Sequence, residues 1–256
     1  MRDPAAVAAA AAEEAGRLVL RRFGTALQVR DKGVADIVTE VDAAAERLIR
    51  RRLAPTGIPV QGEEEGGAEG AQCRWVVDPL DGTVNFAHGN PVFSVSIALI
   101  DKSLPVAGAV HDPTRRETFR AARGRGAWLG GKRLKVTRRH VLLESLLSTG
   151  FSYQRGRTLD RSLARFRAFH HAARAVRRPG SAALDLAYVA AGRFDGFWET
   201  GLKPWDVAAG WLLVTEAGGK VTDFRGRPYA LGTADILASN GGLHPAMLRT
   251  LGLSAD

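Results

Sequence analysis

The stretch that most constrains this chain is residues 75–86, where a short apolar segment meets two carboxylates. Its first three residues are bulky and apolar, which predicts a buried strand ending at Asp78. Pro79 biases Asp78 toward an extended conformation, and Asp81 follows in what we expect to be a tight turn. Both carboxylates can therefore point into one cavity.

A glycine and a hydroxyl residue come directly after the second carboxylate. Gly82 allows a close backbone approach and leaves its amide for a ligand. If a helix begins near Thr83, its first amides form an anion site. Two carboxylates this close in apolar surroundings repel each other, so either one takes up a proton or a cation lies between them. The alternative is a solvated Asp-Pro-x-Asp-Gly turn without function.

Other acidic residues stand at places where they could join this pair. Glu63 opens a run of three glutamates after a short strand over 58–61, so two neighbouring strands could both end in carboxylates beside one cation. A solvated loop is the alternative there. Asp42 has a structural explanation, because it closes a Thr-x-x-Asp capping box at a helix start. Asp206 follows a proline at the start of another helix, where the helix dipole favours an acid.

The order of the expected elements predicts an α/β fold of the layered α+β type. The first half reads as an antiparallel meander, with a hairpin at Gly130-Gly131, and later strands and helices alternate. Ser181 is expected to cap a helix over 182–191. We place a boundary between an N-terminal half, 1–142, with the main candidate metal-binding motifs, and a C-terminal half, 143–256, that completes the site.

Composition excludes several other classes of protein. The 256 residues suffice for one large domain or two closely packed ones, and the single cysteine, Cys73, allows no internal disulfide. No apolar run is long enough for a membrane helix, so we expect a cytoplasmic protein with no membrane partner. Gly-x-Ser-x-Gly, Walker and Gly-x-Gly-x-x-Gly motifs are missing, and the histidines show no metal-ligand spacing.

The net charge of +9 leaves a nucleic-acid or RNA-polymerase partner open. Arginine-rich faces bind phosphate backbones, and no aromatic platform or known nucleic-acid motif accompanies them here. The alternative is a solvated basic surface. The arginines concerned are Arg155, Arg157, Arg161, Arg165, Arg167, Arg174, Arg177 and Arg178.

Several motifs in one order resemble the inositol monophosphatase family, most closely its bacterial inositol-1-monophosphatase branch. They are Asp36 to Asp42, Gly62-Glu63-Glu64, Trp75 to Phe86, Gly180 to Ala187, Glu199 to Gly210 and Thr215 to Gly219. Their order and spacing make the resemblance specific over residues 5–252. Val84 departs from the family, where many members have threonine, but it flanks the site.

The resemblance implies an αβαβα sandwich, usually a homodimer, that hydrolyses a small-molecule phosphate monoester with two to three Mg²⁺ ions and is inhibited by Li⁺. Mn²⁺ could replace Mg²⁺. By the same resemblance, the metal ligands would be Glu63, Asp78, the Leu80 carbonyl, Asp81 and Asp206. The phosphate would bind the amides of Gly82 and Thr83. The alcohol would contact Asp81, Gly180, Ser181, Ala182 and Glu199. The catalytic residues would be Glu63, Thr83 and Asp42, with Asp42 holding Thr83.

The residue types agree with this chemistry. All the side-chain ligands are oxygens, which suits Mg²⁺ or Mn²⁺ rather than zinc. The expected reaction converts inositol 1-phosphate to inositol and phosphate by in-line attack of a metal-activated water. Alternatives within the family are fructose-1,6-bisphosphate, NADP(H), a nucleotide 3′-phosphate or histidinol phosphate as substrate. The alternative from another class is a regulatory protein that binds RNA or RNA polymerase.

Overall fold

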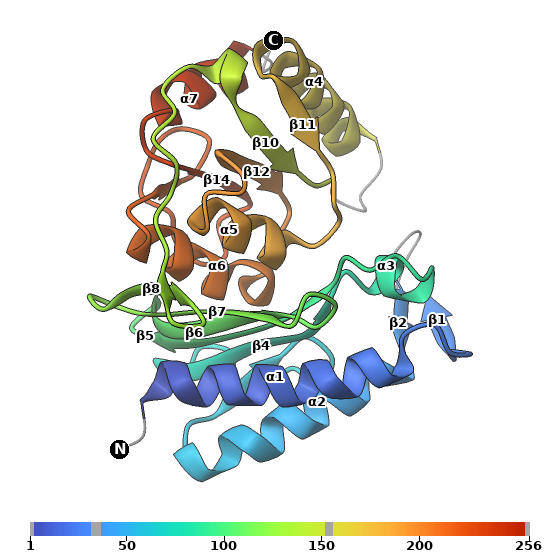
Figure 1. Cartoon of the computed structure of the whole chain (residues 1–256). Helices are drawn as coiled ribbons and strands as arrows, with labels where there is room; N and C mark the ends of the chain where they lie inside the picture. The colour runs from blue at the N-terminus through green and yellow to red at the C-terminus, as the bar shows by residue number, and fades with distance from the viewer. Residues whose placement is uncertain (1–2, 32–36, 152–155, 254–256) are drawn as a thin grey trace.

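The computed structural model describes residues 3–31, 37–151 and 156–253, which form alternating layers of helices and sheets (Figure 1). α1 and α2 cover one face of the first sheet, and α5 and α6 lie between the two sheets. α4 and α7 cover the outer face of the second sheet. The predicted αβαβα sandwich is therefore confirmed. The helices are α1 (Pro4–Arg22), α2 (Glu40–Leu53), α3 (Thr83–Ala87), α4 (Arg157–Ala172), α5 (Ala182–Ala190), α6 (Pro204–Glu216) and α7 (His244–Leu253), with short 3-10 turns η1 (Ala54–Thr56) and η2 (Leu142–Glu144).

The first sheet has seven strands in the order β3-β4-β5-β6-β7-β8-β9. β3 and β4 are parallel, and their register places Gly62 opposite Val77. The next residues along the two strands, Glu63 and Asp78, therefore lie side by side, as the sequence predicted. The strands are β3 (Val60–Gly62), β4 (Cys73–Asp81), β5 (Ser94–Asp101), β6 (Leu104–Asp112), β7 (Glu117–Ala122), β8 (Gly126–Leu129) and β9 (Lys132–Arg133), with β8 and β9 joined at the predicted Gly-Gly hairpin.

The expected tight turn at Asp81 is wrong. β4 continues through Asp81, which pairs with Ser94 of β5 after a register shift that begins at Asp78. An irregularity of this kind bends a strand and changes the direction of a side chain without ending the strand. Both carboxylates therefore belong to one continuous strand.

The second sheet has five strands in the order β11-β10-β12-β14-β13. They are β10 (Leu146–Thr149), β11 (Ala175–Arg177), β12 (Gly196–Thr200), β13 (Lys220–Thr222) and β14 (Asp235–Ser239), and a separate hairpin pairs β1 (Val29–Asp31) with β2 (Ile37–Thr39). The two sheets fall on either side of residues 138–144, but the largest core cluster draws apolar side chains from both sides. The division into halves at residue 142 stays a prediction.

Candidate active site

A cavity of about 300 Å³ lies where the end of β4 meets the N-termini of α5 and α6. Its walls bring together segments that are far apart in the chain, and they contain every predicted site residue except Asp42. Those residues are Glu63, Asp78, Leu80, Asp81, Gly82, Thr83, Gly180, Ser181, Ala182, Glu199 and Asp206.

Asp42 does not line the cavity, but it contacts a residue that does. It makes both of the contacts expected for it, one within the capping box of α2 and one with Thr83. One carboxylate oxygen, Oδ2, accepts hydrogen bonds from the Thr39 amide at 2.9 Å and the Thr39 hydroxyl at 2.5 Å. These contacts belong to the predicted capping box at the start of α2. The other oxygen, Oδ1, accepts from the Thr83 hydroxyl at 3.0 Å. The helix cap therefore fixes the carboxylate that orients a cavity hydroxyl.

Asp81 is held by the start of α5. Its Oδ2 accepts a hydrogen bond from the Ser181 hydroxyl at 2.6 Å and one from the Ala183 amide at 2.8 Å. Ser181 does occupy the N-cap position of α5, but its side chain makes no capping hydrogen bond, so that part of the prediction is wrong. A capping hydroxyl would accept from an amide of the first turn, but the Ala183 amide of α5 donates to the Asp81 carboxylate instead, so Asp81 takes the capping role.

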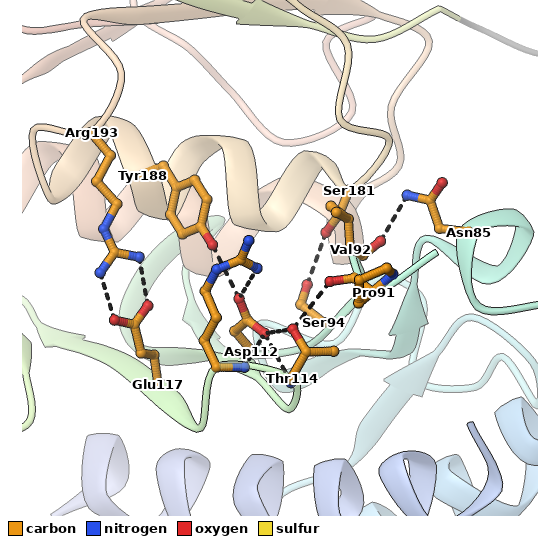
Figure 2. A network of polar contacts seen from close by, with 11 residues as sticks. Asn85, Pro91, Val92, Ser94, Asp112, Thr114, Glu117, Ser181, Tyr188 and Arg193 are labelled. Carbon is orange, nitrogen blue, oxygen red and sulfur yellow. Dashed lines mark hydrogen bonds and ion pairs between the residues drawn. The ribbon is translucent and has the colours of Figure 1, made fainter. Parts of the chain in front are cut away.

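Helix α5 is tied to the first sheet at its other end as well. The Tyr188 hydroxyl donates to Asp112 at 3.1 Å, and Arg193 forms a two-pronged ion pair with Glu117 (Figure 2). Asp112 is the last residue of β6 and Glu117 is the first residue of β7, so both contacts lie beside the turn that joins these strands. They hold α5 along the sheet, so that Ser181 at its start stays opposite Asp81.

Gly82 explains why the end of β4 and the Gly180 backbone can approach so closely. Its φ of +98° lies in the left-handed region, and a Cβ there would be 2.9 Å from the Val92 carbonyl oxygen and 3.1 Å from that of Gly180. A glycine is therefore required by both conformation and space. The close approach expected at this glycine is confirmed, and its neighbours include backbone from both halves of the chain.

The two remaining aspartates are each fixed by a backbone amide. Asp78 Oδ1 accepts from the Leu80 amide at 3.0 Å, and Asp206 Oδ2 accepts from the Lys203 amide at 2.7 Å. Asp206 lies in the first turn of α6 after Pro204, as predicted. Such bonds restrict the rotation of each carboxylate. A ligand that binds these side chains therefore costs less of their conformational entropy.

The acids repel one another. Burial raises the pKa of Asp78 well above its usual range, and the charges of Glu63, Asp81 and Asp206 raise it further. Burial also raises the pKa of Asp206, followed by the charge of Asp81. For Asp81, burial raises the pKa while the bond from Ser181 opposes the shift. A divalent cation among these groups would reverse the shifts, because it favours the charged forms.

Glu199 lies in the cavity wall at the end of β12. Burial, then the charge of Asp81, raise its pKa to about 8, while Arg178 opposes the shift. A Cβ at position 150 would be 2.1 Å from a Glu199 oxygen, so Gly150 leaves the space that this side chain occupies. Glu199 is therefore placed to exchange a hydrogen bond with a polar ligand.

Several cavity residues were missed by the sequence reasoning. Asp185 is fully buried, and its Oδ1, with Ser148 Oγ, is a buried side-chain atom without a hydrogen-bond partner in the described residues. Its position four residues after Ser181 on α5 was a usable signal, because such residues share a helix face. Five others, Thr200, Gly201, Leu202, Lys203 and Trp205, lie inside the Glu199 to Gly210 motif, whereas Gly150, Phe151 and Arg178 had no local signal.

The donor set of the cavity fits a hard divalent cation in chemical type. It offers carboxylates and a backbone carbonyl, and burial and the neighbouring acids raise the pKa of Asp78, a group whose charged form a divalent cation would stabilise. Among the described residues, however, no group of three or more His, Cys, Asp or Glu side chains is arranged to hold a metal ion.

Comparison with known proteins gives one family over residues 1–253. Residues 1–253 match the model of the inositol monophosphatase family. Nus factor SuhB of Pseudomonas aeruginosa is 47% identical, over 96% of this chain and 94% of its own length. Inositol-1-monophosphatase of Synechocystis sp. is 42% identical, over 96% of this chain and 87% of its own length.

Solved structures give the same result. The extragenic suppressor protein suhB from Bartonella henselae has a TM-score of 0.90 at 42% identity, with 96% of this chain and 97% of that chain covered. An IMPase from Thermotoga maritima has a TM-score of 0.89 at 35% identity, with 96% and 95% covered. No helix among the described residues combines the length and apolar character needed to cross a bilayer.

Proposed function

This chain belongs to the inositol monophosphatase family, and from that premise we propose that its cavity hydrolyses phosphate monoesters, with inositol 1-phosphate as the preferred substrate. The observation that carries the proposal is the convergence of Glu63, Asp78, Asp81 and Asp206 on one cavity beside the start of α3. Buried acids that repel one another are poor structural elements but suitable ligands for a cation.

The proposed cofactor is Mg²⁺, held by these four carboxylates and the Leu80 carbonyl. Bound Mg²⁺ would neutralise the phosphoryl oxygens, lower the pKa of a water and stabilise the leaving alkoxide. The protein supplies orientation. Glu63 and the Thr83 hydroxyl would position the attacking water, with Thr83 held by Asp42 at 3.0 Å. The amides of Gly82 and Thr83 would donate to the phosphate.

The alcohol part of the substrate would lie against the C-terminal half. Ser181 and Glu199 line that side of the cavity with Gly180 and Ala182. Glu199, with its pKa raised to about 8, can donate a hydrogen bond when protonated or accept one when ionised. Polyhydroxylated alcohols suit such a wall, because several of their hydroxyls can bond at once.

A substrate panel tests this proposal. Phosphate release from inositol 1-phosphate is expected to require Mg²⁺, to stop in EDTA and to decrease with Li⁺. Fructose-1,6-bisphosphate, NADP⁺, a nucleotide 3′-phosphate and histidinol phosphate serve as competitors, and inositol 1-phosphate is expected to have the highest kcat/KM. A higher kcat/KM for any competitor would replace the substrate assignment, and release that is unaffected by EDTA would contradict the proposed metal site.

A second candidate function is a regulatory one, by binding to RNA or RNA polymerase, and it fits the relatives named Nus factor SuhB. A basic segment supports it in this chain. Arg133, Lys135, Arg138 and His140, which we call the basic strap, are all exposed and line a hollow of about 680 Å³. The arginines noted in the sequence are less uniform, because Arg178 lines the active-site cavity and Arg165 lies over Phe224 at 4.5 Å. Arg155, one of those arginines, lies outside the described residues, and so does Asp36, the first residue of the Asp36 to Asp42 motif.

Fluorescence anisotropy with a single-stranded RNA at two salt concentrations tests this second function. If the strap binds about four phosphates, affinity is expected to fall at least tenfold between about 50 and 200 mM KCl. The double variant Lys135→Ala/Arg138→Ala should weaken binding, whereas Arg47→Ala/Arg51→Ala, at two exposed positions on α2, serves as the control. No binding at low salt would rule out this function.

A further inference from the structure

A buried carboxylate behind the cavity has contacts that the proposed reaction does not explain. Glu46 lies on α2 and is fully buried. Its Oε2 accepts a hydrogen bond from the Glu64 amide at 2.7 Å, and its Oε1 accepts one from the Glu65 amide at 3.1 Å. Arg50, one turn further along α2, donates to Oε1 from Nε at 2.9 Å and from Nη2 at 2.8 Å. One carboxylate thus joins a helix to two successive amides of a loop.

Arg50 completes the connection on the other side of the loop. It donates to the Gly66 carbonyl at 2.6 Å and to the Val60 carbonyl at 3.2 Å. The loop closes on itself as well, because the Gly62 amide donates to Gly66 at 3.0 Å. The Glu46–Arg50 pair therefore holds both the amides and the carbonyls of residues 60–66, at a point where α2 lies beneath the first sheet (Figure 1).

The loop held in this way carries Glu63. The Glu63 amide donates to the Val77 carbonyl at 3.2 Å, which connects it to β4 just before Asp78. The two amides that follow Glu63 are those bound by Glu46. Only glycine fits at position 62 beside this carboxylate, because a Cβ there would be 2.0 Å from Glu46 Oε1. The backbone of Glu63 is thus fixed on one side by β4 and on the other by α2.

We propose that Glu46 and Arg50 are positioning residues that fix the Glu63 loop and thereby set the affinity of the site for its metal ion. This inference rests on the proposed Mg²⁺-dependent function. Neither residue lines the cavity, so they act through Glu63 and not on the substrate. A carboxylate that binds two backbone amides and an arginine keeps the loop in one arrangement, and its ligand side chain then needs less reordering when the ion binds.

The test uses Glu46→Gln in the full chain. The amide nitrogen of glutamine cannot accept a hydrogen bond, so one of the two loop contacts is lost while the size of the side chain is kept. The Mg²⁺ concentration for half-maximal activity is expected to rise about tenfold, as for other residues that support metal ligands, with kcat at saturating Mg²⁺ within about twofold of wild type. Mn²⁺ affinity by calorimetry without substrate should fall by a similar factor, and the Glu64 and Glu65 amides should exchange hydrogen faster.

A matched control is available elsewhere in the fold. Glu216 at the end of α6 also accepts from two loop amides, those of Gly124 and Gly126, each at 2.8 Å. Glu216→Gln removes the same kind of contact away from the cavity and should leave Mn²⁺ affinity unchanged. Arg50→Lys is the second variant, in case Glu46→Gln does not fold, and it is expected to weaken Mn²⁺ affinity in the same direction.

The outcomes separate this inference from the function on which it rests. Faster amide exchange in Glu46→Gln with unchanged Mn²⁺ affinity would overturn the inference, because the pair would then have only a structural role. An equal loss of affinity in Glu216→Gln would overturn it too, since the effect would be general destabilisation. If wild-type protein neither binds Mn²⁺ nor releases phosphate, the proposed function itself fails, and the wild-type measurement alone shows it.

Discussion

Asp81→Asn is expected to lower kcat/KM for Mg²⁺-dependent phosphate release by about a thousandfold, the loss typical of removing one group that stabilises transition-state charge. Asp81 is the proposed ligand placed between the other acids, since its charge raises the pKa of Asp78, Asp206 and Glu199. Asparagine offers one oxygen, and its NH₂ group cannot coordinate a cation. The variant should also bind Mn²⁺ more weakly by calorimetry.

The loss should not come from unfolding. The oxygen of asparagine can take the position of Asp81 Oδ2 and accept from the Ser181 hydroxyl and the Ala183 amide. Removing a charge from a group of buried acids also relieves repulsion, so the melting temperature in EDTA should stay equal or rise. Asp101→Asn, at the exposed far end of β5, is the control and should retain activity. Phosphate release by Asp81→Asn within about threefold of wild type would show that Asp81 is not a ligand of the catalytic metal and that the proposed metal site is wrong.

The parts of the site that could be predicted from sequence are those determined by local chemistry. The Thr-x-x-Asp pattern at Asp42 predicted a capping box, and the box is present. The proline before Asp206 predicted a helix start, and α6 begins there. Two apolar strands that end in acids predicted that Glu63 and Asp78 would be neighbours, and the parallel register of β3 and β4 brings them together. The first two signals lie within a few residues of their effects, and the third joins two strands that follow each other along the chain.

The parts that could not be predicted depend on contacts between distant segments. Ser181 has the right residue type and position for a helix cap, but Asp81, 100 residues earlier in the chain, accepts hydrogen bonds from its hydroxyl and from the Ala183 amide at the start of α5. Glu46 and Arg50 at i and i+4 suggest an ordinary ion pair on a helix surface. Only the fold places the amides of Glu64 and Glu65 against that carboxylate. Residue type and spacing specify what a side chain can bind, and packing decides which partner it meets.

In EDTA, the protein is expected to become less stable as the pH rises from 6.5 to 9. The folded state raises the pKa of Glu199 from 4.5 to about 8, because the side chain is buried close to Asp81. Glu199 therefore adds to the free energy of unfolding while it is protonated in the folded state. This contribution is fully present below pH 4.5 and is lost as the pH rises through about 8. Buried His244 works in the opposite direction, since its pKa falls from 6.5 to about 4, but its contribution is complete above pH 6.5.

Between pH 6.5 and 9 the loss from Glu199 amounts to about 2 kcal/mol, or about 5 °C in melting temperature. Scanning calorimetry in EDTA at several pH values measures it. Glu199→Gln should reduce the slope because the amide does not titrate, while the raised pKa values of Asp78 and Asp206 keep part of it. Adding Mg²⁺ should raise the melting temperature most at high pH, where the acids are charged and an ion that binds only the folded state stabilises it. A melting temperature in EDTA that is constant or rises over this range would mean that the cavity acids are already compensated without a divalent ion, which would remove the physical reason for placing one among them.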